Sequence, residues 1–572
     1  MAPHMGRRGG ASKARTAVPD KPARAQASFA RRWWGKILLL LATIALLNLA
    51  FAPFKQFYLA WVALVPWMLV IVNCRSARTA FFWSWLGGIA FFTANMWWLV
   101  YVTGPGMAAL MAVLGLYWAM AGAIIRGANL LQARSPKRVL GAVLLIAAVW
   151  VTFEWFHGIW PLGGLAWGYI GQSQAPALPL CQIADITGVY GISFFVAMVN
   201  AWVAMLVLRS PRMNIWLTGE GEAPAGLVIL IVGAGILIYG FFRLSQHPTT
   251  PGPRVLVVQP DYPQSNSGEK SASPQEILDF HVRTTREALA KNPNVDLVVW
   301  SETMLPPINQ SARDFARAHH LAVDWEEAND QALRLAREFN VGILIGGLYY
   351  ENWKTKGDYY IPTDRRNSTY LYTPQGVADL RYDKIHLVPF GETLPFKSSF
   401  PPLYALFLSL SPYSEEYTLT PGPPDAMTVF QMPQGWRFVT PICFEDLDAP
   451  LLDRMLAPLD GRKRGDFIVN LTNDGWFKAN EMSQHLQNAI FRSIENRAPT
   501  ARSVNTGISG FIDSAGRASD LVPAGREGLS VATLMLDSRI TLYARIGDVF
   551  AYLCASAAGL LLVVTLIQWW RK

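Results

Sequence analysis

Residues 254–260 read RVLVVQP, a short run of β-branched side chains that a proline ends, which is typical of a buried strand. Similar runs recur at 295–300, 341–348, 369–372, 438–442, 467–471 and 510–512. Stretches with helical periodicity separate several of them, at 274–291, 324–338 and 484–497. Strands that alternate with helices, with some strand pairs joined directly, predict a layered α/β domain with a mixed sheet.

The remainder of the 572-residue chain is far more apolar. The whole sequence is 52% hydrophobic and its mean hydropathy is positive. Eight apolar runs approach the roughly 20 residues that a membrane-spanning helix needs: 37–52, 58–73, 79–103, 107–131, 139–160, 192–208, 227–243 and 550–570. We therefore predict a membrane domain of seven spans at 35–245, a globular domain at 246–548, and an eighth span at 549–572.

The net charge of +9 could indicate nucleic-acid binding, but its distribution argues against that function. Residues 246–548 carry 29 Lys and Arg against 36 Asp and Glu, whereas the remaining residues carry 21 against 5. The excess of positive charge lies in the tails and in alternate short connections. We expect no nucleic-acid partner, and the positive-inside rule places both termini in the cytoplasm and residues 246–548 outside.

The N-terminal region allows two interpretations of the first span. Residues 1–34 are basic and poor in large apolar side chains, which predicts a disordered cytoplasmic tail. Arg31 and Arg32, followed by an apolar run and by the small residues Ala50 and Ala52, also fit a secretory signal with a cleavage site. Cleavage there would leave the orientation of the other spans unchanged.

Cys443 is the only cysteine of the globular segment, so a disulfide framework is excluded there. A lone cysteine is either a buried apolar side chain or a reactive thiol. The segment has no Gly-rich dinucleotide or Walker loop, and spacings such as HExxH and CxxC are absent from the sequence. We therefore expect no metal and no cofactor.

Three segments place potentially reactive side chains at or just beyond strand ends, which is where α/β folds build active sites. They are residues 298–302 (VVWSE), 381–392 (RYDKIHLVPFGE) and 441–446 (PICFED). A cysteine nucleophile needs a base, and a tetrahedral acyl intermediate needs its oxyanion neutralised. Glu302 and Lys384 could provide these two functions for Cys443.

These segments, in this order, resemble the Glu-Lys-Cys triad of the nitrilase superfamily. The sequences EWF, WGY, QIADITGVYGISF, NDGWF and NTG extend the similarity, at 154–156, 167–169, 182–194, 473–477 and 505–507. Together they resemble the apolipoprotein N-acyltransferase family over residues 35–570. The resemblance implies a multi-span α-helical membrane bundle that carries a nitrilase-like αββα sandwich, with the triad inserted between the seventh and eighth spans.

By this resemblance, Cys443 is the nucleophile, Glu302 the general base and acid, and Lys384 the oxyanion stabiliser. Four supporting residues follow from the same comparison: Glu392, which orients the site, Asn367, Glu445, and Phe444, whose backbone N–H is a second oxyanion donor. For Asn367, Glu445 and His386 a purely structural function is an open alternative. Glu154 and His157, near the outer end of the fifth span, could equally brace helices or contact substrate.

The sequence departs from the family at two places. Phe444 stands where the family commonly has a tyrosine, so the hydrogen bond of that hydroxyl is lost. Residues 265–268 (SNSG) occupy the place of a tryptophan that follows the first strand, which puts the cover of the acyl pocket in doubt.

The resemblance implies a two-step reaction at the outer face of the bacterial cytoplasmic membrane. Cys443 would take the sn-1 acyl chain of phosphatidylethanolamine as a thioester, and the α-amine of a lipoprotein's S-diacylglyceryl-cysteine would accept it. The apolar segment 401–410 could be a lipid-facing loop or an ordinary buried helix. The alternatives are a membrane-tethered amidase, in which water accepts the acyl group, and a catalytically silent receptor or scaffold.

Overall fold

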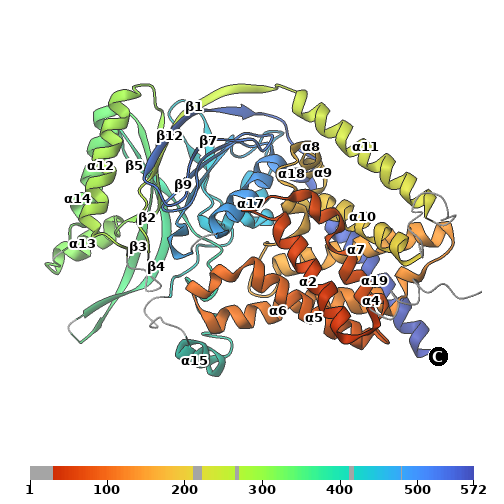
Figure 1. The fold of residues 1–572 in the computed structure, drawn as a ribbon. Helices are drawn as coiled ribbons and strands as arrows, with labels where there is room; N and C mark the ends of the chain where they lie inside the picture. Colours follow the sequence, from red (N-terminus) through yellow and green to blue (C-terminus); the bar gives the residue numbers. More distant parts are fainter. Residues whose placement is uncertain are drawn as a thin grey trace, which may run out of the picture.

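The computed structural model describes residues 30–209, 222–264, 270–321, 323–357, 359–410, 418–477 and 480–571. It has two parts, a helical bundle built from both ends of the chain and an α/β sandwich built from the middle (Figure 1). The sequence expectations for residues 1–29, including most of the basic tail, and for 265–268 lie outside the described residues.

Every apolar run predicted to span the membrane is helical. Among the described residues, six helices of the bundle are long and apolar enough to cross a bilayer: α2 (Trp33–Ala50), α6 (Gly104–Gly127), α7 (Pro136–Ile159), α10 (Val189–Arg209), α11 (Ala223–Ser245) and α19 (Val549–Trp570). The run at 57–72 is broken into η1 (Phe57–Leu59), α3 (Ala60–Ala63) and α4 (Val65–Val72), and α5 (Ala77–Asn95) is continuous but less apolar. The eight-span count therefore remains a prediction.

The bundle exposes apolar side chains that a soluble protein would bury. On α11, Leu230 and Ile238 are 69% and 70% exposed, and on α19 Leu560 is 67% exposed. Helices that are apolar on all sides are stable only when lipid or protein surrounds them. α2, in contrast, contributes Leu40 and Leu47 to the bundle core, so the first span is an integral part of the folded bundle.

The middle of the chain forms two six-stranded sheets. The first has the order β12-β1-β2-β3-β4-β5 and the second β11-β10-β9-β8-β7-β6. Their strands are β1 (Thr249–Gln259), β2 (Leu297–Leu305), β3 (Gly342–Lys356), β4 (Tyr359–Thr373), β5 (Gly376–Asp383), β6 (Phe430–Gln431), β7 (Arg437–Val439), β8 (Phe467–Thr472), β9 (Thr500–Val504), β10 (Ser509–Ile512), β11 (Ala518–Val522) and β12 (Gly528–Asp537). β1, β2 and β3 pair in parallel, as do β7, β8 and β9.

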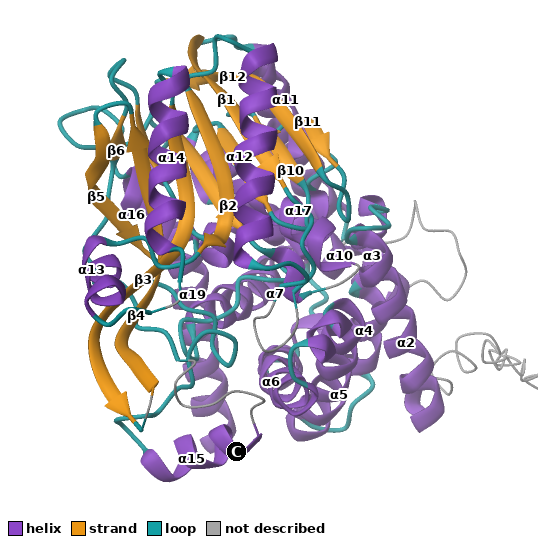
Figure 2. Cartoon of the chain, turned by 90° about the vertical axis from the view of Figure 1, so that its left-hand side faces the viewer, coloured by secondary structure: helices purple, strands orange, loops and turns teal. Residues whose placement is uncertain are grey.

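Successive side chains of a strand point to opposite faces of its sheet, and this alternation forms the layers of the sandwich. Val257 and Val299 point toward the second sheet and pack with its residue Val469. Their neighbours Val258 and Val298 face the opposite way, onto α12 (Pro274–Lys291) and α14 (Trp325–Phe339). Figure 2 shows these two helices lying across the outer face of their sheet. α16 (Ala449–Leu456) and α17 (Asn480–Asn496) lie on the other side, which confirms the αββα sandwich.

α17 joins the sandwich to the bundle. Its Gln484 accepts hydrogen bonds from the indole N–H groups of Trp98 and Trp167, at 3.3 and 2.9 Å. Just beyond α17, the buried Arg497 forms an ion pair of 2.6 Å with Asp185 of the bundle. The buried ion pair between Arg497 and Asp185 fixes the sandwich against the bundle, because separating the two parts would leave each charge unpaired.

All predicted strands and helices of the sandwich overlap an observed element, but the segment 401–410 differs from both expectations. It forms α15 (Pro401–Leu410), and Leu406 on this helix is 52% exposed, so the segment is neither a loop nor a buried helix. Tyr404 is the one buried side chain among residues 401–409, for which burial is described, and Phe407 packs on Phe390 with ring centroids 5.0 Å apart.

Candidate active site

A buried cluster of charged and polar side chains lies on β2 and β4 and just beyond the end of β5. Lys384, which directly follows β5, donates to Glu302 Oε1 at 3.2 Å and to Glu392 Oε1 at 3.0 Å. Asn367 of β4 donates its amide to the same two oxygens, at 2.6 and 3.1 Å. The structure thus brings together four residues that the sequence analysis singled out.

The electrostatics of this cluster favour one protonated amine between two carboxyl groups. Burial alone would lower the pKa of Lys384, but the Glu302 and Glu392 carboxylates outweigh it and raise that pKa well above its ordinary value. Burial raises the pKa of Glu302, and Lys384 opposes that shift. Glu302 Oε2 has no hydrogen-bond partner among the described residues, which leaves it able to accept a proton.

Cys443 is the first residue of the short helix η6 (Cys443–Leu447), which follows β7 of the second sheet. Its φ of +55° lies in the left-handed region, which is rare for residues other than glycine and common at strained functional turns. Burial and the Glu302 carboxylate raise the pKa of the thiol, whereas Lys384 lowers it. The thiol is therefore protonated at neutral pH, and it becomes a nucleophile only if a base removes the proton.

Glu445 connects the loop that follows Lys384 to the turn at Cys443. Its Oε1 accepts from the backbone N–H groups of Ile385 and His386, at 2.8 and 2.9 Å, and its Oε2 accepts from that of Ile442, at 2.8 Å. The Tyr382 hydroxyl donates to it as well, at 2.9 Å. Burial raises the pKa of Glu445 to about 7, while these backbone contacts oppose the shift. This bonding pattern favours a positioning function.

Phe444, next to Cys443, lies between the Lys384 ammonium and the His386 imidazole. Lys384 Nζ is 5.8 Å from the centre of the Phe444 ring, and the His386 ring lies 4.8 Å from it. The ring thus covers the Lys384 ammonium on one side, a contact that needs no hydroxyl group.

A second buried network, not found from the sequence, lies behind Cys443. The Asn470 amide donates to the Cys443 carbonyl at 3.1 Å and accepts from Arg502 at 2.7 Å. Arg502 pairs with Asp446 at 2.8 Å, and His485 of α17 also donates to Asp446, at 2.9 Å. Asn470 and Arg502 stand on strands that are buried throughout, but the polar residues Thr500 and Ser503 flank Arg502 on β9, so the sequence carries little signal for it.

Asp474, Glu481 and His485 are close enough together to suggest a metal site. His485, however, uses both ring nitrogens for carboxylates, Asp446 at 2.9 Å and Asp474 at 3.1 Å. Burial and Arg502 would lower the pKa of His485, but these two carboxylates outweigh them and raise it well above its ordinary value. A metal needs a neutral imidazole with a free nitrogen, so this donor set fits an ion-pair network better than a metal.

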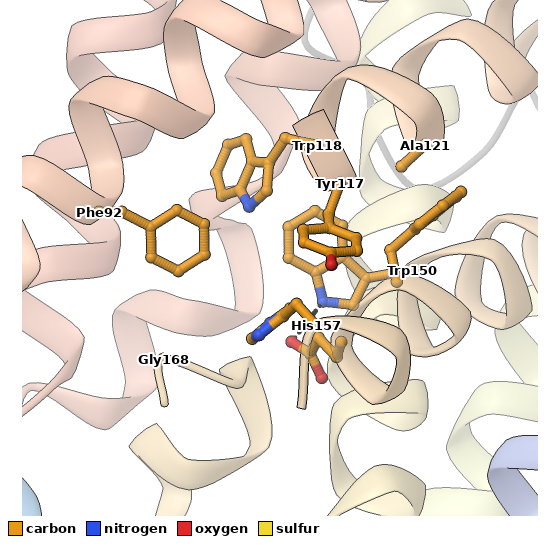
Figure 3. Close-up of a pocket in the computed structure, with 9 residues that line it drawn as sticks. Phe92, Tyr117, Trp118, Ala121, Trp150, His157 and Gly168 are labelled. Carbon is orange, nitrogen blue, oxygen red and sulfur yellow. Dashed lines mark hydrogen bonds between the residues drawn. The ribbon is translucent and has the colours of Figure 1, made fainter. Parts of the chain in front are cut away.

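Glu154 and His157 of α7 line an aromatic pocket inside the bundle, with Tyr117 and Trp118 around them (Figure 3). Glu154 accepts from the Trp150 indole and from the backbone N–H of Ile170, both at 2.7 Å. His157 Nδ1 lies 3.0 Å from the Leu165 carbonyl. These contacts connect α7 to the loop that follows it, which supports the bracing interpretation of both residues.

Comparison with known proteins gives matches to both halves of the chain. Residues 45–202 match the apolipoprotein N-acyltransferase N-terminal domain family, and residues 254–543 match the carbon-nitrogen hydrolase family. Among solved structures, an amidase from Nesterenkonia sp. covers 54% of this chain and 100% of its own, with 15% identity and a TM-score of 0.34. By its match to the family model, the sandwich is a carbon-nitrogen hydrolase domain joined to a membrane bundle.

Full-length relatives named apolipoprotein N-acyltransferase share both halves. The protein from Caulobacter vibrioides is 30% identical over 544 residues, which cover 91% of this chain and 92% of the relative. The protein from Geobacter metallireducens is 29% identical and covers 90% and 91%. The chain belongs to the apolipoprotein N-acyltransferase family.

Proposed function

We propose that this protein is an acyltransferase that moves a phospholipid acyl chain to the α-amine of an S-diacylglyceryl-cysteine at the N-terminus of lipoproteins. The observation that carries the proposal is the geometry of the site: the buried Lys384 donates to Glu302, whose other oxygen has no partner among the described residues, and it lies over the Phe444 ring next to the left-handed turn at Cys443. Family membership supports the same function. The donor is the sn-1 ester of phosphatidylethanolamine.

In the first step Glu302 takes the proton of the Cys443 thiol, and the thiolate attacks the ester carbonyl carbon. Lys384 and the Phe444 backbone N–H stabilise the negative oxygen of the tetrahedral intermediate. When the intermediate collapses, the carbon–oxygen bond breaks, and the leaving alkoxide takes the proton back from Glu302. The products are a thioester on Cys443 and a lysophospholipid.

In the second step the neutral amine of the acceptor attacks the thioester carbonyl. Glu302 takes a proton from the nitrogen as the carbon–nitrogen bond forms, and it returns that proton to the departing Cys443 sulfur. Asn367 and Glu392 hold Glu302 and Lys384 in place during both steps through the hydrogen bonds described above. The products are an amide and the free thiol.

We also propose the division into a cytoplasmic tail at 1–34, a membrane domain at 35–245, an extracytoplasmic catalytic domain at 246–548 and a last span at 549–572. The location is the bacterial cytoplasmic membrane. Arg75, Arg134 and Arg571 lie at one end of the bundle helices, and the sandwich lies at the other, as the positive-inside rule requires. Both substrates are lipid-anchored, which gives a physical reason for attaching this chemistry to membrane helices.

The function can be tested with purified protein in detergent or vesicles. With phospholipid alone, we expect release of about one equivalent of lysophospholipid per active site and then no further turnover, because the thioester waits for an amine. Addition of a diacylglyceryl-cysteine peptide should restart turnover, and an amine-blocked peptide should not. Cys443→Ala should give no burst.

Two results would contradict the proposal. Continuous release of free fatty acid that the peptide does not change would show that water is the natural acceptor, as in an amidase-like hydrolase. A normal burst from Cys443→Ala would remove the covalent mechanism. Mass spectrometry of the protein should place the added acyl mass on the peptide containing Cys443.

A further inference from the structure

Strand β2 contains a bulge at the end that carries the proposed general base. β2 pairs regularly with β3 up to Trp300, and pairing resumes only at Leu305. Residues 301–304 of β2 thus stand opposite the single residue Gly346 of β3. Within the bulge, Thr303 has a φ of +52°, a left-handed conformation that is unfavourable for a β-branched side chain. Such a backbone persists only when its surroundings hold it.

The bulge decides which way Glu302 faces. Side chains alternate along a strand, so Val299 points toward the second sheet and Trp300 toward the outer helices. Continued alternation would turn Glu302 outward, onto α12. Glu302 instead meets Asn367, which lies on the inner face of β4, two residues before the inward-pointing Thr369. The bulge thus turns the proposed base into the site, a function that bulges next to active sites commonly have.

The bulge lies directly against the backbone of β3. A Cβ built on Gly346 would be 2.5 Å from the Ser301 carbonyl oxygen and 2.7 Å from the Glu302 Cα. Any larger residue would push the bulged strand away, so the close approach requires glycine at this position. The path of the bulge is therefore set partly by β3.

Lys270, from the loop that follows β1, holds the bulge from a second segment. Its ammonium donates to the Thr303 carbonyl at 2.7 Å. The Lys270 backbone forms an antiparallel bridge with Gln264, which anchors the lysine to the chain just beyond β1. Burial lowers the pKa of Lys270 to about 8, and the neighbouring Glu302 carboxylate opposes that shift. The ammonium is thus close enough to Glu302 to stabilise its charged form.

We propose that Lys270 is a positioning residue for the transfer reaction: its ammonium holds the Thr303 carbonyl, and with it the bulge that turns Glu302 into the site. The hydrogen bond offsets the strain at Thr303, because a charged donor binds a carbonyl more strongly than a neutral one does. The positive charge also favours the carboxylate form of Glu302, which is the form that takes the thiol proton. This inference rests on the proposed transferase function, and it concerns a lysine outside the Glu-Lys-Cys set.

Four other titratable groups face Glu302 and Lys270. They are Lys384, Glu392 and the Cys443 thiol on the side of the site, and His281 of α12 on the outer side. Burial lowers the pKa of His281 to about 4, so its imidazole is neutral near pH 7. All four groups stay in place when Lys270 is substituted, so a shifted pH profile reports the loss of the Lys270 charge.

The test measures the rate of the lysophospholipid burst in full-length protein that carries Lys270→Met or Lys270→Arg. Methionine keeps the apolar stem and removes both the charge and the donor, whereas arginine keeps both. We expect Lys270→Met to slow the burst by about 10–100-fold near neutral pH, the loss typical of a hydrogen bond to a charged group. Lys270→Arg should stay within about fivefold of wild type. Lys291→Met, at an exposed position at the end of α12, is the matched control.

The pH profile gives a readout that a purely structural function would not change. Without the Lys270 charge, the pKa of Glu302 rises, so the base is protonated up to a higher pH. The acidic limb of the burst-rate profile should therefore move to higher pH in Lys270→Met and stay in place in Lys270→Arg. A wild-type burst with an unshifted limb in Lys270→Met would overturn the inference.

Two further measurements separate positioning from contact with the substrate. The phospholipid concentration that gives half of the maximal burst rate should not change in Lys270→Met, because the lysine acts on the base and not on the donor. In the same background, Thr303→Gly should recover part of the lost rate, because glycine adopts the left-handed conformation without strain. A raised half-saturating concentration, with no recovery by arginine or by glycine, would show that Lys270 binds the phospholipid and would contradict positioning.

Thermal unfolding in detergent checks that the variants fold. If Lys270→Met does not, Lys270→Gln takes its place, because glutamine keeps a donor and removes the charge. The acidic limb of Lys270→Gln should then move to higher pH, and an unshifted limb would refute the inference. Absence of a burst in the wild-type protein would instead refute the proposed function itself.

Discussion

Two buried charge clusters flank Cys443, and they differ in how their central groups are paired. On one side, Lys384 serves both Glu302 and Glu392, and Glu302 keeps one oxygen without a partner. On the other side, both ring nitrogens of His485 and both side-chain oxygens of Asp446 are engaged. A group that must accept a proton needs a free site, whereas a group that holds a turn in place needs none. The comparison supports the proposal that Glu302 accepts a proton and that His485 and Asp446 hold the turn in place; Glu481 Oε2 and Arg502 Nε of the second cluster also lack a partner among the described residues.

Glu302→Gln should give the largest effect on activity, because glutamine keeps the shape of the side chain but cannot accept the thiol proton. We expect the rate of the lysophospholipid burst to fall by about 10²–10⁴-fold, with the melting temperature little changed. Glu287→Gln, on the exposed face of α12, is the matched control. A burst within tenfold of wild type would mean that the free oxygen of Glu302 is not the proton acceptor.

Arg502→Met should affect stability more than chemistry. It removes the cation that pairs with Asp446 and with Asp474, at 2.8 and 3.5 Å, and leaves two buried carboxylates beside His485 without that partner. We expect a loss of about 3–5 kcal/mol in unfolding free energy, measured by denaturant or thermal unfolding in detergent. Arg283→Met, at an exposed position of α12, should cost little. Wild-type stability with a lost burst would instead place Arg502 in the chemical machinery.

Glu481 makes the second cluster sensitive to pH. Burial and the neighbouring Asp474 raise the pKa of Glu481 from 4.5 to about 7. The folded state therefore binds this proton more tightly than the unfolded state, and the contribution to stability is complete below pH 4.5 and lost as the pH rises through 7.

Glu481→Gln should reduce the fall in unfolding free energy between pH 5 and pH 8 by on the order of 1–3 kcal/mol. This appears as a flatter dependence of the melting temperature on pH. The difference between the two profiles isolates Glu481, because Glu445 and Glu495 titrate in the same range and are present in both proteins. Parallel profiles would show that Glu481 does not titrate there.

Phe444→Tyr should have the smallest effect. The ring packs between Lys384 and His386 through its faces, and tyrosine keeps that packing while it restores the hydroxyl common in the family. We expect a change of less than about tenfold in the burst rate, which corresponds to less than 1.4 kcal/mol. A larger gain would show that the absent hydroxyl limits this enzyme.

Much of the sandwich could be predicted from sequence because its signals are local. The run at 254–260 alternates between the two faces of β1, and proline ends it. The edge strands β11 and β12 were not predicted, because residues such as Ala518 and Ser519 carry little of the β-branched signal and depend on their neighbours for pairing.

The same distinction holds within the site. The sequence could suggest Glu302, Lys384 and Cys443 because they stand in three segments that resemble a known family, at or just beyond predicted strands. Glu392 and Asn367 were proposed from the same resemblance. Asn470, Arg502 and His485 carry no local pattern, and they gain a function only because β8, β9 and α17 bring them behind Cys443.

The sequence by itself determined the apolar helices and many of the sandwich strands, and it predicted three reactive side chains, because hydrophobic periodicity and side-chain chemistry act over a few residues. Only the tertiary structure decided which charges are paired and which atoms stay free. Pairing depends on distances of about 3 Å between segments far apart in the chain. Those distances leave Glu302 Oε2 without a partner among the described residues and place a carboxylate at each ring nitrogen of His485, two features that the residue types alone leave undetermined.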